Sequence, residues 1–200
     1  GLHQGSDIFP QNSQGLQCTA MSATAIAYAS VQNISTWTAN ILDEVLIRGE
    51  AYFQQQNQMR TQEESRLPMN TDDIDGYVNG VFGSFTIKIS SDHGSLIAGM
   101  LNKFKTRTES PIRLNTAIQT FIDLGHTYGI LTTAGYSMAL VIEDNYLYFF
   151  DSHSRGPKGG VSLNGSSCVL KYELTSAKSL STLVHKNVQP RSSPNLDDTR

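Results

Sequence analysis

Strand-like runs in the second half of the chain constrain its fold most strongly. They cover residues 128–133, 137–142 and 146–151, and they are rich in aromatic, β-branched and other apolar side chains. Only Glu143-Asp144-Asn145 separates the second run from the third, which is the length of a hairpin turn. The segment therefore predicts an antiparallel sheet.

Helical patterns precede this sheet. Residues 18–29 are rich in alanine and other small side chains, with apolar residues at helical spacing, and this predicts a tightly packed and mostly buried helix. Further helices are expected over residues 41–53 and 114–122, and further strands over residues 84–90 and 168–174. Helices followed by an antiparallel sheet indicate an α+β fold.

Composition narrows the class of protein. The chain has 200 residues, of which 38% are hydrophobic and 16% are charged, so it is long enough to bury the core of one domain. A formal net charge of −3 excludes a strongly basic protein that binds nucleic acid or a membrane surface. We expect no nucleic-acid partner, no membrane partner and a monomer. Because the chain does not begin with Met, we interpret it as a piece of a longer polypeptide.

The chain has two cysteines, which are too few for a disulfide framework or for a four-thiolate zinc site. A single bridge between Cys18 and Cys168 stays an alternative, but low cysteine usage favours a reducing, intracellular compartment. Cys168 lies just ahead of an apolar run, which is typical of a small buried side chain. We expect no cofactor and no metal.

Cys18 stands where the first predicted helix begins. Unpaired backbone N–H groups and the positive end of the helix dipole favour a thiolate there, and the thiolate is the nucleophilic form of cysteine. A nucleophile needs a base, and the candidates are the five histidines: His3, His93, His126, His153 and His185. These positions do not by themselves identify the base.

Asp151 and His153 end the last of the strand-like runs. Residues two apart in an extended chain project from the same face, so this carboxylate can sit beside this imidazole and fix its tautomer. The alternative is a turn with both side chains in solvent, and spacing alone does not bring either residue to Cys18.

Ordered motifs extend this candidate site along the chain. The most specific are Phe150-Asp151-Ser152-His153-Ser154-Arg155-Gly156 at a strand end and Gln17-Cys18 at a helix start. Others are Gln4-Gly5-x-Asp7-x-Phe9, Trp37 ahead of Leu42-Asp43-x-Val45-Leu46-x-x-Gly49, and Tyr128-Gly129-Ile130-Leu131-Thr132. Together they resemble the deubiquitinating domain of the herpesvirus large tegument protein, and the chain is identified as a member of the viral tegument-like deubiquitinase family.

The resemblance implies a papain-like cysteine protease, with a helical lobe packed on an antiparallel sheet. It makes Cys18 the nucleophile, His153 the general base and later acid, and Asp151 the carboxylate that orients the imidazole. Gln4 matches the glutamine that donates to the oxyanion together with the Cys18 backbone N–H, although Gln14 and Gln17 lie close to it in sequence. Gln17 is interpreted as a residue that shapes the turn.

Ubiquitin or polyubiquitin is the partner that the resemblance implies, and the reaction is hydrolysis of the bond after its C-terminal glycine through an acyl-enzyme thioester. An acidic cluster at Asp72, Asp73 and Asp75 is either a receptor for an arginine of the ubiquitin tail or an ordinary solvated loop. Strand pairing of the extended tail near Thr132–Ser137 is a second expected contact. The implied location is the cytoplasm, including that of a host cell.

Two other interpretations of the function stay open. One keeps the fold but changes the outcome, to a protease for another ubiquitin-like modifier or to an acyltransferase. The other is an inactive ubiquitin-binding module. For domain organisation, we expect a catalytic domain over residues 1–175, with a polar connector or insertion at 54–71, and a polar, mobile tail over residues 176–200.

Overall fold

A computed structural model describes residues 1–79, 86–90 and 112–188 of the chain. Its main elements are α1 (Cys18–Ala29), α2 (Ala39–Asn57), β1 (Asp75–Asn79), β2 (Thr86–Ser90), α3 (Leu114–Asp123), β3 (Tyr128–Thr133), β4 (Tyr136–Glu143), β5 (Tyr146–Arg155), β6 (Ser166–Glu173) and α4 (Ala177–Asn187). Short 3-10 helices lie between them: η1 (Ile34–Thr36), η2 (Glu64–Arg66), η3 (Thr71–Asp73) and η5 (Leu174–Ser176).

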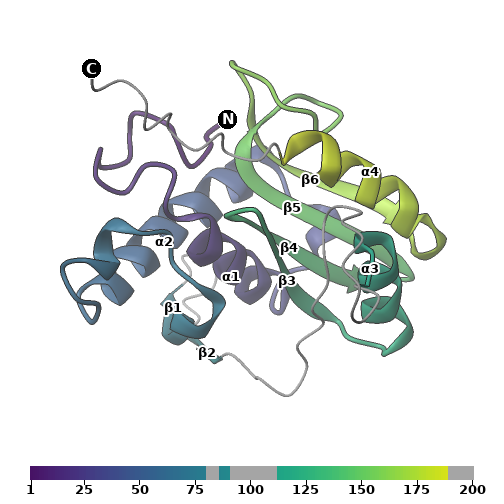
Figure 1. The fold of residues 1–200 in the computed structure, drawn as a ribbon, viewed down its shortest axis with the longest axis horizontal. Coiled ribbons are helices and arrows are strands. Elements are labelled where there is room, and N and C mark those ends of the chain that lie inside the picture. Colours follow the sequence, from purple (N-terminus) through teal and green to yellow (C-terminus); the bar gives the residue numbers. More distant parts are fainter. Residues whose placement is uncertain (80–85, 91–111, 189–200) are drawn as a thin grey trace, which may run out of the picture.

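The central sheet has four antiparallel strands in the order β3-β4-β5-β6, and β1 and β2 form a separate antiparallel pair (Figure 1). Two-residue turns join β3 to β4, through Ala134 and Gly135, and β4 to β5, through Asp144 and Asn145. All four turn residues have positive φ, which gives the turns a twist that matches the flanking strands. The antiparallel sheet and its second hairpin are as predicted.

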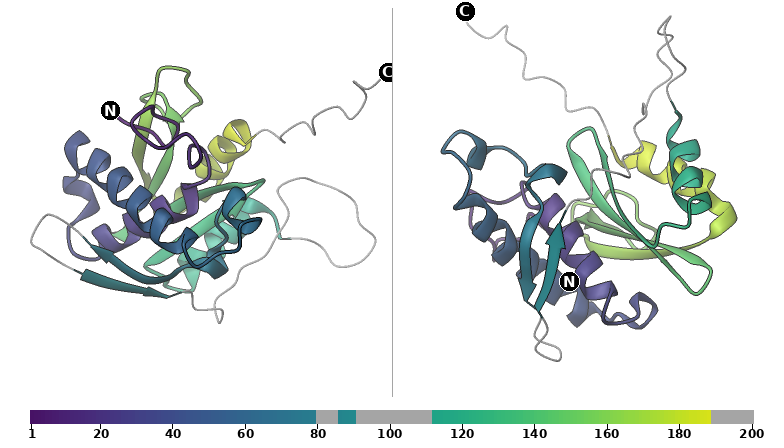
Figure 2. Two further views of the ribbon diagram at one scale, coloured as in Figure 1. Left: turned by 90° about the vertical axis from the view of Figure 1, so that its left-hand side faces the viewer. Right: turned by 90° about the horizontal axis from the view of Figure 1, so that it is seen from below.

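Helices cover both faces of the sheet. Figure 2 shows α1 and α2 on one side and α3 and α4 on the other. Along β4, Ala139 and Val141 pack on the side of α1, whereas Met138 and Leu140 pack on the side of α3 and α4. Because both faces are buried, successive residues of β4 and β5 are apolar, as in strands covered by helices on both faces.

The first helix lies at the centre of the molecule, between α2 and the sheet. All of its residues except Ile26 are buried, which explains its small side chains. Gly49 on α2 allows the closest approach, because a Cβ atom at this position would lie 2.6 Å from Met21 Cγ and 2.8 Å from Met21 Cα. The close packing of these two helices holds α1 in place, and with it Cys18, its first residue.

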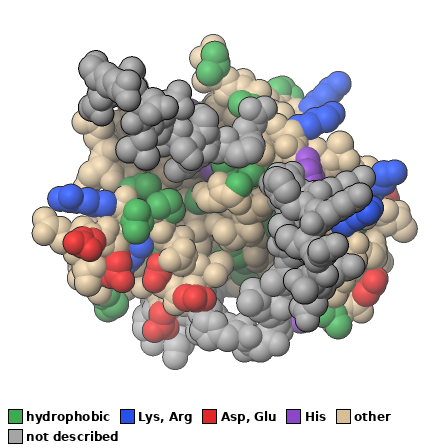
Figure 3. Space-filling view, in the orientation of Figure 1, with side chains coloured by type: hydrophobic (Ala, Val, Ile, Leu, Met, Phe, Trp, Pro, Cys, Tyr) green, Lys and Arg blue, Asp and Glu red, His purple; other side chains and the backbone are tan. Residues whose placement is uncertain are grey.

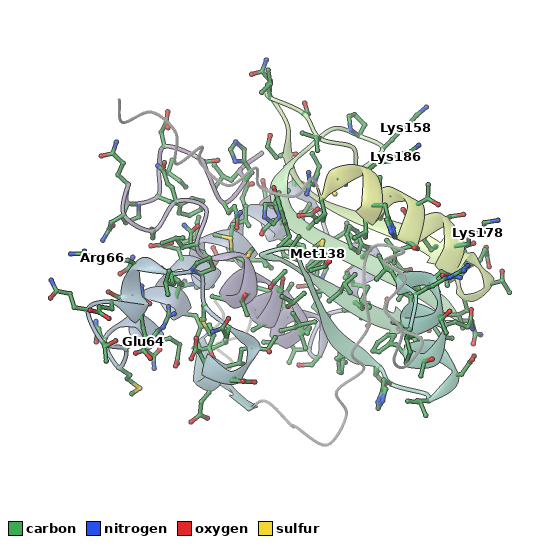
Figure 4. All side chains as sticks on the ribbon, viewed as in Figure 1. Glu64, Arg66, Met138, Lys158, Lys178 and Lys186 are labelled. Atoms are coloured by element: carbon green, nitrogen blue, oxygen red, sulfur yellow. The ribbon has the colours of Figure 1, made fainter. Side chains whose placement is uncertain are left out.

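The chain after residue 175 differs from the expectation. Residues 177–187 form α4 rather than a mobile tail, and Leu180 and Val184 on this helix are 0% exposed. Figure 4 shows Lys178 and Lys186 on the outer side of α4. The helix is amphipathic, so its polar composition hides an apolar stripe that covers the sheet. The folded unit thus extends beyond residue 175, and residues 189–200 lie outside the described part.

The polar connector at 54–71 begins as the end of α2 and continues as a loop with η2. Arg60 ties the loop together by donating to the carbonyl oxygens of Leu67 and Pro68 at 3.3 Å. Met69, at its end, is 2% exposed and packs in the core. Strand β1, which follows it, was not expected, and of the strand expected over 84–90 the structure describes residues 86–90.

Candidate active site

Cys18 is the first residue of α1 and is 1% exposed. In the part of the chain that the structure describes, no side chain caps this helix at Gln17. The first-turn N–H groups therefore have no side-chain acceptor at the cap, which is the setting that favours an anion beside them. The thiol sulfur lies 3.9 Å from the carbonyl oxygen of Gly135, at the tip of the β3–β4 hairpin.

Asp151 and His153 lie near the end of β5, and their side chains meet as the strand spacing predicts. His153 Nδ1 and Asp151 Oδ1 are 2.6 Å apart, and the same oxygen accepts the backbone N–H of His153 at 3.0 Å. Asp151 is 0% exposed. A carboxylate bound to Nδ1 leaves Nε2 as the ring nitrogen for chemistry.

Cys18 and His153 influence each other's ionisation although they are far apart in sequence. Burial opposes ionisation of the Cys18 thiol, but the hydrogen bond and charge of His153, with hydrogen bonds from Ser137, lower its pKa below the ordinary value. Burial also opposes the imidazolium, but Asp151 and Cys18 outweigh it and raise the pKa of His153 to about 9. The pair therefore favours a thiolate beside an imidazolium.

Burial opposes ionisation of Asp151 as well. The hydrogen bond and charge of His153, together with the charge of Arg155, outweigh that effect and hold the pKa of Asp151 below its ordinary value. The result is a buried row of alternating charges, from Arg155 through Asp151 and His153 to Cys18. Burial of a charge is tolerated only when the charge is paired, and each charged group in this row has a partner of opposite sign.

Gln4 differs from Gln14 and Gln17 in how its amide is used. Its backbone N–H donates to Ser152 O at 2.8 Å, and Ser152 Oγ donates to Gln4 Oε1 at 3.4 Å. Its Nε2 donates to none of the described residues. By contrast, Gln14 Nε2 donates to Phe9 O at 3.0 Å, and Gln17 Nε2 donates to Glu50 Oε2 at 2.7 Å. Gln17 thus links the loop before α1 to α2, and Gln4 is the one of the three with amide hydrogens to spare.

The β3–β4 hairpin supplies contacts that the sequence did not indicate. The ring of Tyr136 packs on that of His153, with 4.7 Å between their centres. Ser137 is 2% exposed, and its Oγ lies 2.9 Å from Thr19 Oγ1 and 3.0 Å from Thr132 Oγ1. Thr19 in turn donates to Met69 O at 2.6 Å, so a chain of hydroxyls joins the hairpin, α1 and the connector. Hairpin residues next to a predicted strand carry no sequence signal for such a role.

None of the other histidines that the structure describes completes this site. His126 packs on Phe121, His185 Nδ1 lies 2.8 Å from Ser181 O, and His93 lies outside the described residues. His3 is closer to the site: burial, and then the charge of His153, lower its pKa against the opposing effect of Asp7. Among the described residues, no group of His, Cys, Asp or Glu side chains is arranged to hold a metal ion.

Cys168 is a free thiol on β6, paired in register with Asp151, and it forms no disulfide with Cys18. Its exposure is intermediate, which corrects the expectation of a small buried side chain. Burial, and then the charge of Asp151, raise its pKa to about 12. A thiol in this state is a poor nucleophile.

Acidic side chains gather at the lower left of the face shown in Figure 3, on the side of α2 and β1. Within the acidic cluster expected there, Asp73 accepts the backbone N–H of Asn70 at 2.9 Å and lies 3.7 Å from Arg60 Nε. Asp72 and Asp75 are exposed. The other expected contact, near Thr132–Ser137, falls on β3, which is an edge strand of the sheet, and on the hairpin beside Cys18.

Two comparisons relate the chain to known proteins. The family model described as the herpesvirus tegument protein, N-terminal conserved region, matches residues 1–195. The chain belongs to this tegument family. A search of the curated proteins gives no match for the tegument domain. No helix in its described ranges is long and apolar enough to cross a membrane.

The fold of the tegument domain is similar to that of a solved structure, the ubiquitin-specific protease encoded by murine cytomegalovirus tegument protein M48 in complex with a ubiquitin-based suicide substrate. The TM-score is 0.69 at 13% identity, over 96% of the tegument domain and 79% of the other chain. The likeness confirms the fold class of the tegument domain: α+β, of papain-like type, with a helical lobe packed on an antiparallel sheet.

Proposed function

We propose that the domain is a cysteine deubiquitinase that cleaves the bond after the C-terminal glycine of ubiquitin. The observation that carries this proposal is the row Cys18–His153–Asp151. A thiol at a helix N-terminus raises the pKa of an imidazole whose Nδ1 lies 2.6 Å from a buried carboxylate. These are the parts that a thiol hydrolase needs. The fold similarity to a viral ubiquitin-specific protease supports ubiquitin as the substrate.

In this mechanism the Cys18 thiolate attacks the carbonyl carbon of the terminal glycine. The carbonyl oxygen becomes an oxyanion, which the Cys18 backbone N–H and the unused amide hydrogens of Gln4 stabilise. The His153 imidazolium gives its proton to the leaving amine, and the carbon–nitrogen bond breaks to leave a thioester. His153 then takes a proton from water, which attacks the thioester and releases ubiquitin and the thiol.

Tyr136 and Asp151 serve His153 in this scheme. Asp151 keeps the ring in one tautomer and stabilises its cationic form, while the ring of Tyr136 shields one face of the imidazole from water. The hairpin tip at Gly135 lies beside the thiol, so an extended peptide bound to Cys18 passes close to it and to the edge strand β3.

Ubiquitin with a C-terminal electrophile tests the proposal. The wild-type domain should form a covalent adduct, detected by intact mass, and peptide mapping should place it on Cys18. The Cys18→Ala variant should form none, whereas Cys168→Ala, a matched control, should react as the wild type does. A folded wild-type domain that fails to react at Cys18 would refute the proposal.

Parallel reactions separate the rival functions. Probes built on other ubiquitin-like modifiers reveal a different modifier preference, and an added amine acceptor reveals transfer in place of hydrolysis. Binding of ubiquitin to Cys18→Ala, measured beside wild-type turnover, distinguishes an enzyme from an inactive binding module, because a module binds without hydrolysing. A panel of diubiquitin linkages then defines which chains are cleaved.

A further inference from the structure

Arg155 is a buried cation behind the candidate active site. It ends β5, is 4% exposed, and its Nε donates to Asp151 Oδ2 at 2.6 Å. The pairing between β5 and β6 is irregular between Asp151 and Arg155, and this irregularity lies where the two side chains meet. Arg155 belongs to the motif Phe150–Gly156, and its place in the sequence predicts no role for it.

The Asp151 carboxylate is held at both oxygens. Oδ1 accepts the ring and backbone N–H groups of His153, and Oδ2 accepts Arg155 Nε. Rotation of the carboxylate about its Cβ–Cγ bond would break both sets of contacts together. The contact from Arg155 Nε therefore helps to fix the plane in which Asp151 meets the imidazole, as a charge-assisted hydrogen bond does.

The loop between β5 and β6, residues 156–165, covers Arg155 and holds it in this position. Ser166 of β6 pairs with Arg155, and a Cβ atom at Gly165 would overlap the Arg155 backbone. Gly165 and Arg155 also line a pocket of about 350 Å³ with Cys168. The close passage of Gly165 holds the backbone of Arg155 at the point from which its side chain reaches Asp151.

The burial of Arg155 is costly, which argues against a purely structural role. Its Nη2 is buried and has no hydrogen-bond partner among the described residues. A buried donor without a partner destabilises the folded state, and buried ion pairs are in general weak contributors to stability. A cost of this kind is expected where a charge is retained for the chemistry next to it.

We propose that Arg155 is a positioning residue for the reaction, which holds the Asp151 carboxylate ionised and aligned on the His153 ring. This inference rests on the proposed function for its catalytic consequence. The charged and titratable groups that face Asp151 and its hydrogen-bonded partner are Arg155 and His153 on β5, Cys168 on β6, Cys18 on α1 and His3 in the N-terminal loop.

The test follows the proton between His153 Nδ1 and Asp151. A charge-assisted hydrogen bond of this length gives a far-downfield proton NMR signal, which is lost when acid protonates the carboxylate. Without Arg155 the acid midpoint of this loss should rise by about one pH unit or more, since an adjacent opposite charge lowers a carboxyl pKa by about 1–3 units. Turnover of a ubiquitin substrate should fall on acidification with the same raised midpoint.

The variants are Arg155→Met and Arg155→Gln, which remove the charge, and Arg155→Lys, which keeps it. Both neutral variants should raise the midpoint, and the lysine variant should restore it while turnover at the plateau stays below wild type. Arg48→Met is the matched control, because Arg48 pairs with Glu44 on the surface of α2, and it should leave the midpoint unchanged. If Arg155→Met does not fold, the acid midpoint is measured in Arg155→Gln instead.

A folded neutral variant with the wild-type midpoint would overturn the inference, and so would a loss of turnover that is equal at every pH. The NMR midpoint is measured without substrate. If the wild-type domain fails to react with the ubiquitin probe while the midpoint still depends on Arg155, the proposed function falls and the positioning role stands.

Discussion

Replacing Gly49 by alanine tests whether the contact between α1 and α2 sets the position of Cys18. In a helix, alanine is favoured over glycine by about 1 kcal/mol, so propensity alone predicts that Gly49→Ala stabilises the domain. The structure predicts the opposite. The added Cβ would lie 2.8 Å from Met21 Cα, where carbon atoms prefer about 3.5–4.0 Å, so the two helices must separate by roughly 1 Å.

The size of the effect follows from where this separation occurs. Met21, Leu46 and Phe53 are 0% exposed around the crossing, so moving the helices strains a filled core. Overpacking of this kind costs about 1–3 kcal/mol, and the helix preference of alanine offsets about 1 kcal/mol of it. We expect a net loss of up to about 2 kcal/mol, which lowers the Tm of a domain of this size by up to roughly 8 °C.

Thermal and urea unfolding measure the loss, and Ala51→Gly provides the control. Ala51 is exposed on the same helix, so this change measures helix propensity without packing and should cost about 1 kcal/mol. Because α1 begins at Cys18, Gly49→Ala should also slow the reaction of Cys18 with the ubiquitin probe, whereas Ala51→Gly should not. A Gly49→Ala domain that is more stable than wild type would refute the packing argument.

Three further outcomes are expected. Gln4→Ala should lower turnover by about 10²–10³, the usual value of one oxyanion donor, without abolishing it, and Gln14→Ala should not, as measured by steady-state cleavage of a ubiquitin fusion. The wild-type domain should stay active up to about pH 9 and lose activity above it, because the raised pKa keeps His153 protonated below that pH. Asp151→Asn should move the midpoint of this alkaline loss of activity down toward pH 6.5. An unchanged midpoint would contradict the role of Asp151. Leu180→Ala should destabilise the domain by about 2–5 kcal/mol in urea unfolding, whereas Lys178→Ala on the exposed side of α4 should change little; equal effects would show that α4 does not cover the core.

Local patterns predicted most of the secondary structure because they depend on near neighbours. The small side chains of 18–29, the two-residue turn after Glu143 and the apolar runs of β4 and β5 each carry their own signal. The contact between Asp151 and His153 is of the same kind, since two residues of one strand meet whatever surrounds them. The amphipathic helix α4 was hidden because its polar residues outnumber its buried ones.

Residue patterns identified Cys18, His153 and Asp151 as candidates, but only the tertiary structure brings the thiol to the imidazole. The two lie on different elements, and their meeting depends on the packing of α1 against the sheet. The same holds for Gln4, whose Nε2, unlike those of Gln14 and Gln17, donates to none of the described residues. It holds too for Arg155, whose contact with Asp151 lies beneath the loop that covers it. Sequence determines which groups a strand or a helix presents. Packing between residues that are far apart in sequence decides which of these groups share a low-dielectric site. Because charges interact strongly in such a site, packing also decides which of the groups are ionised.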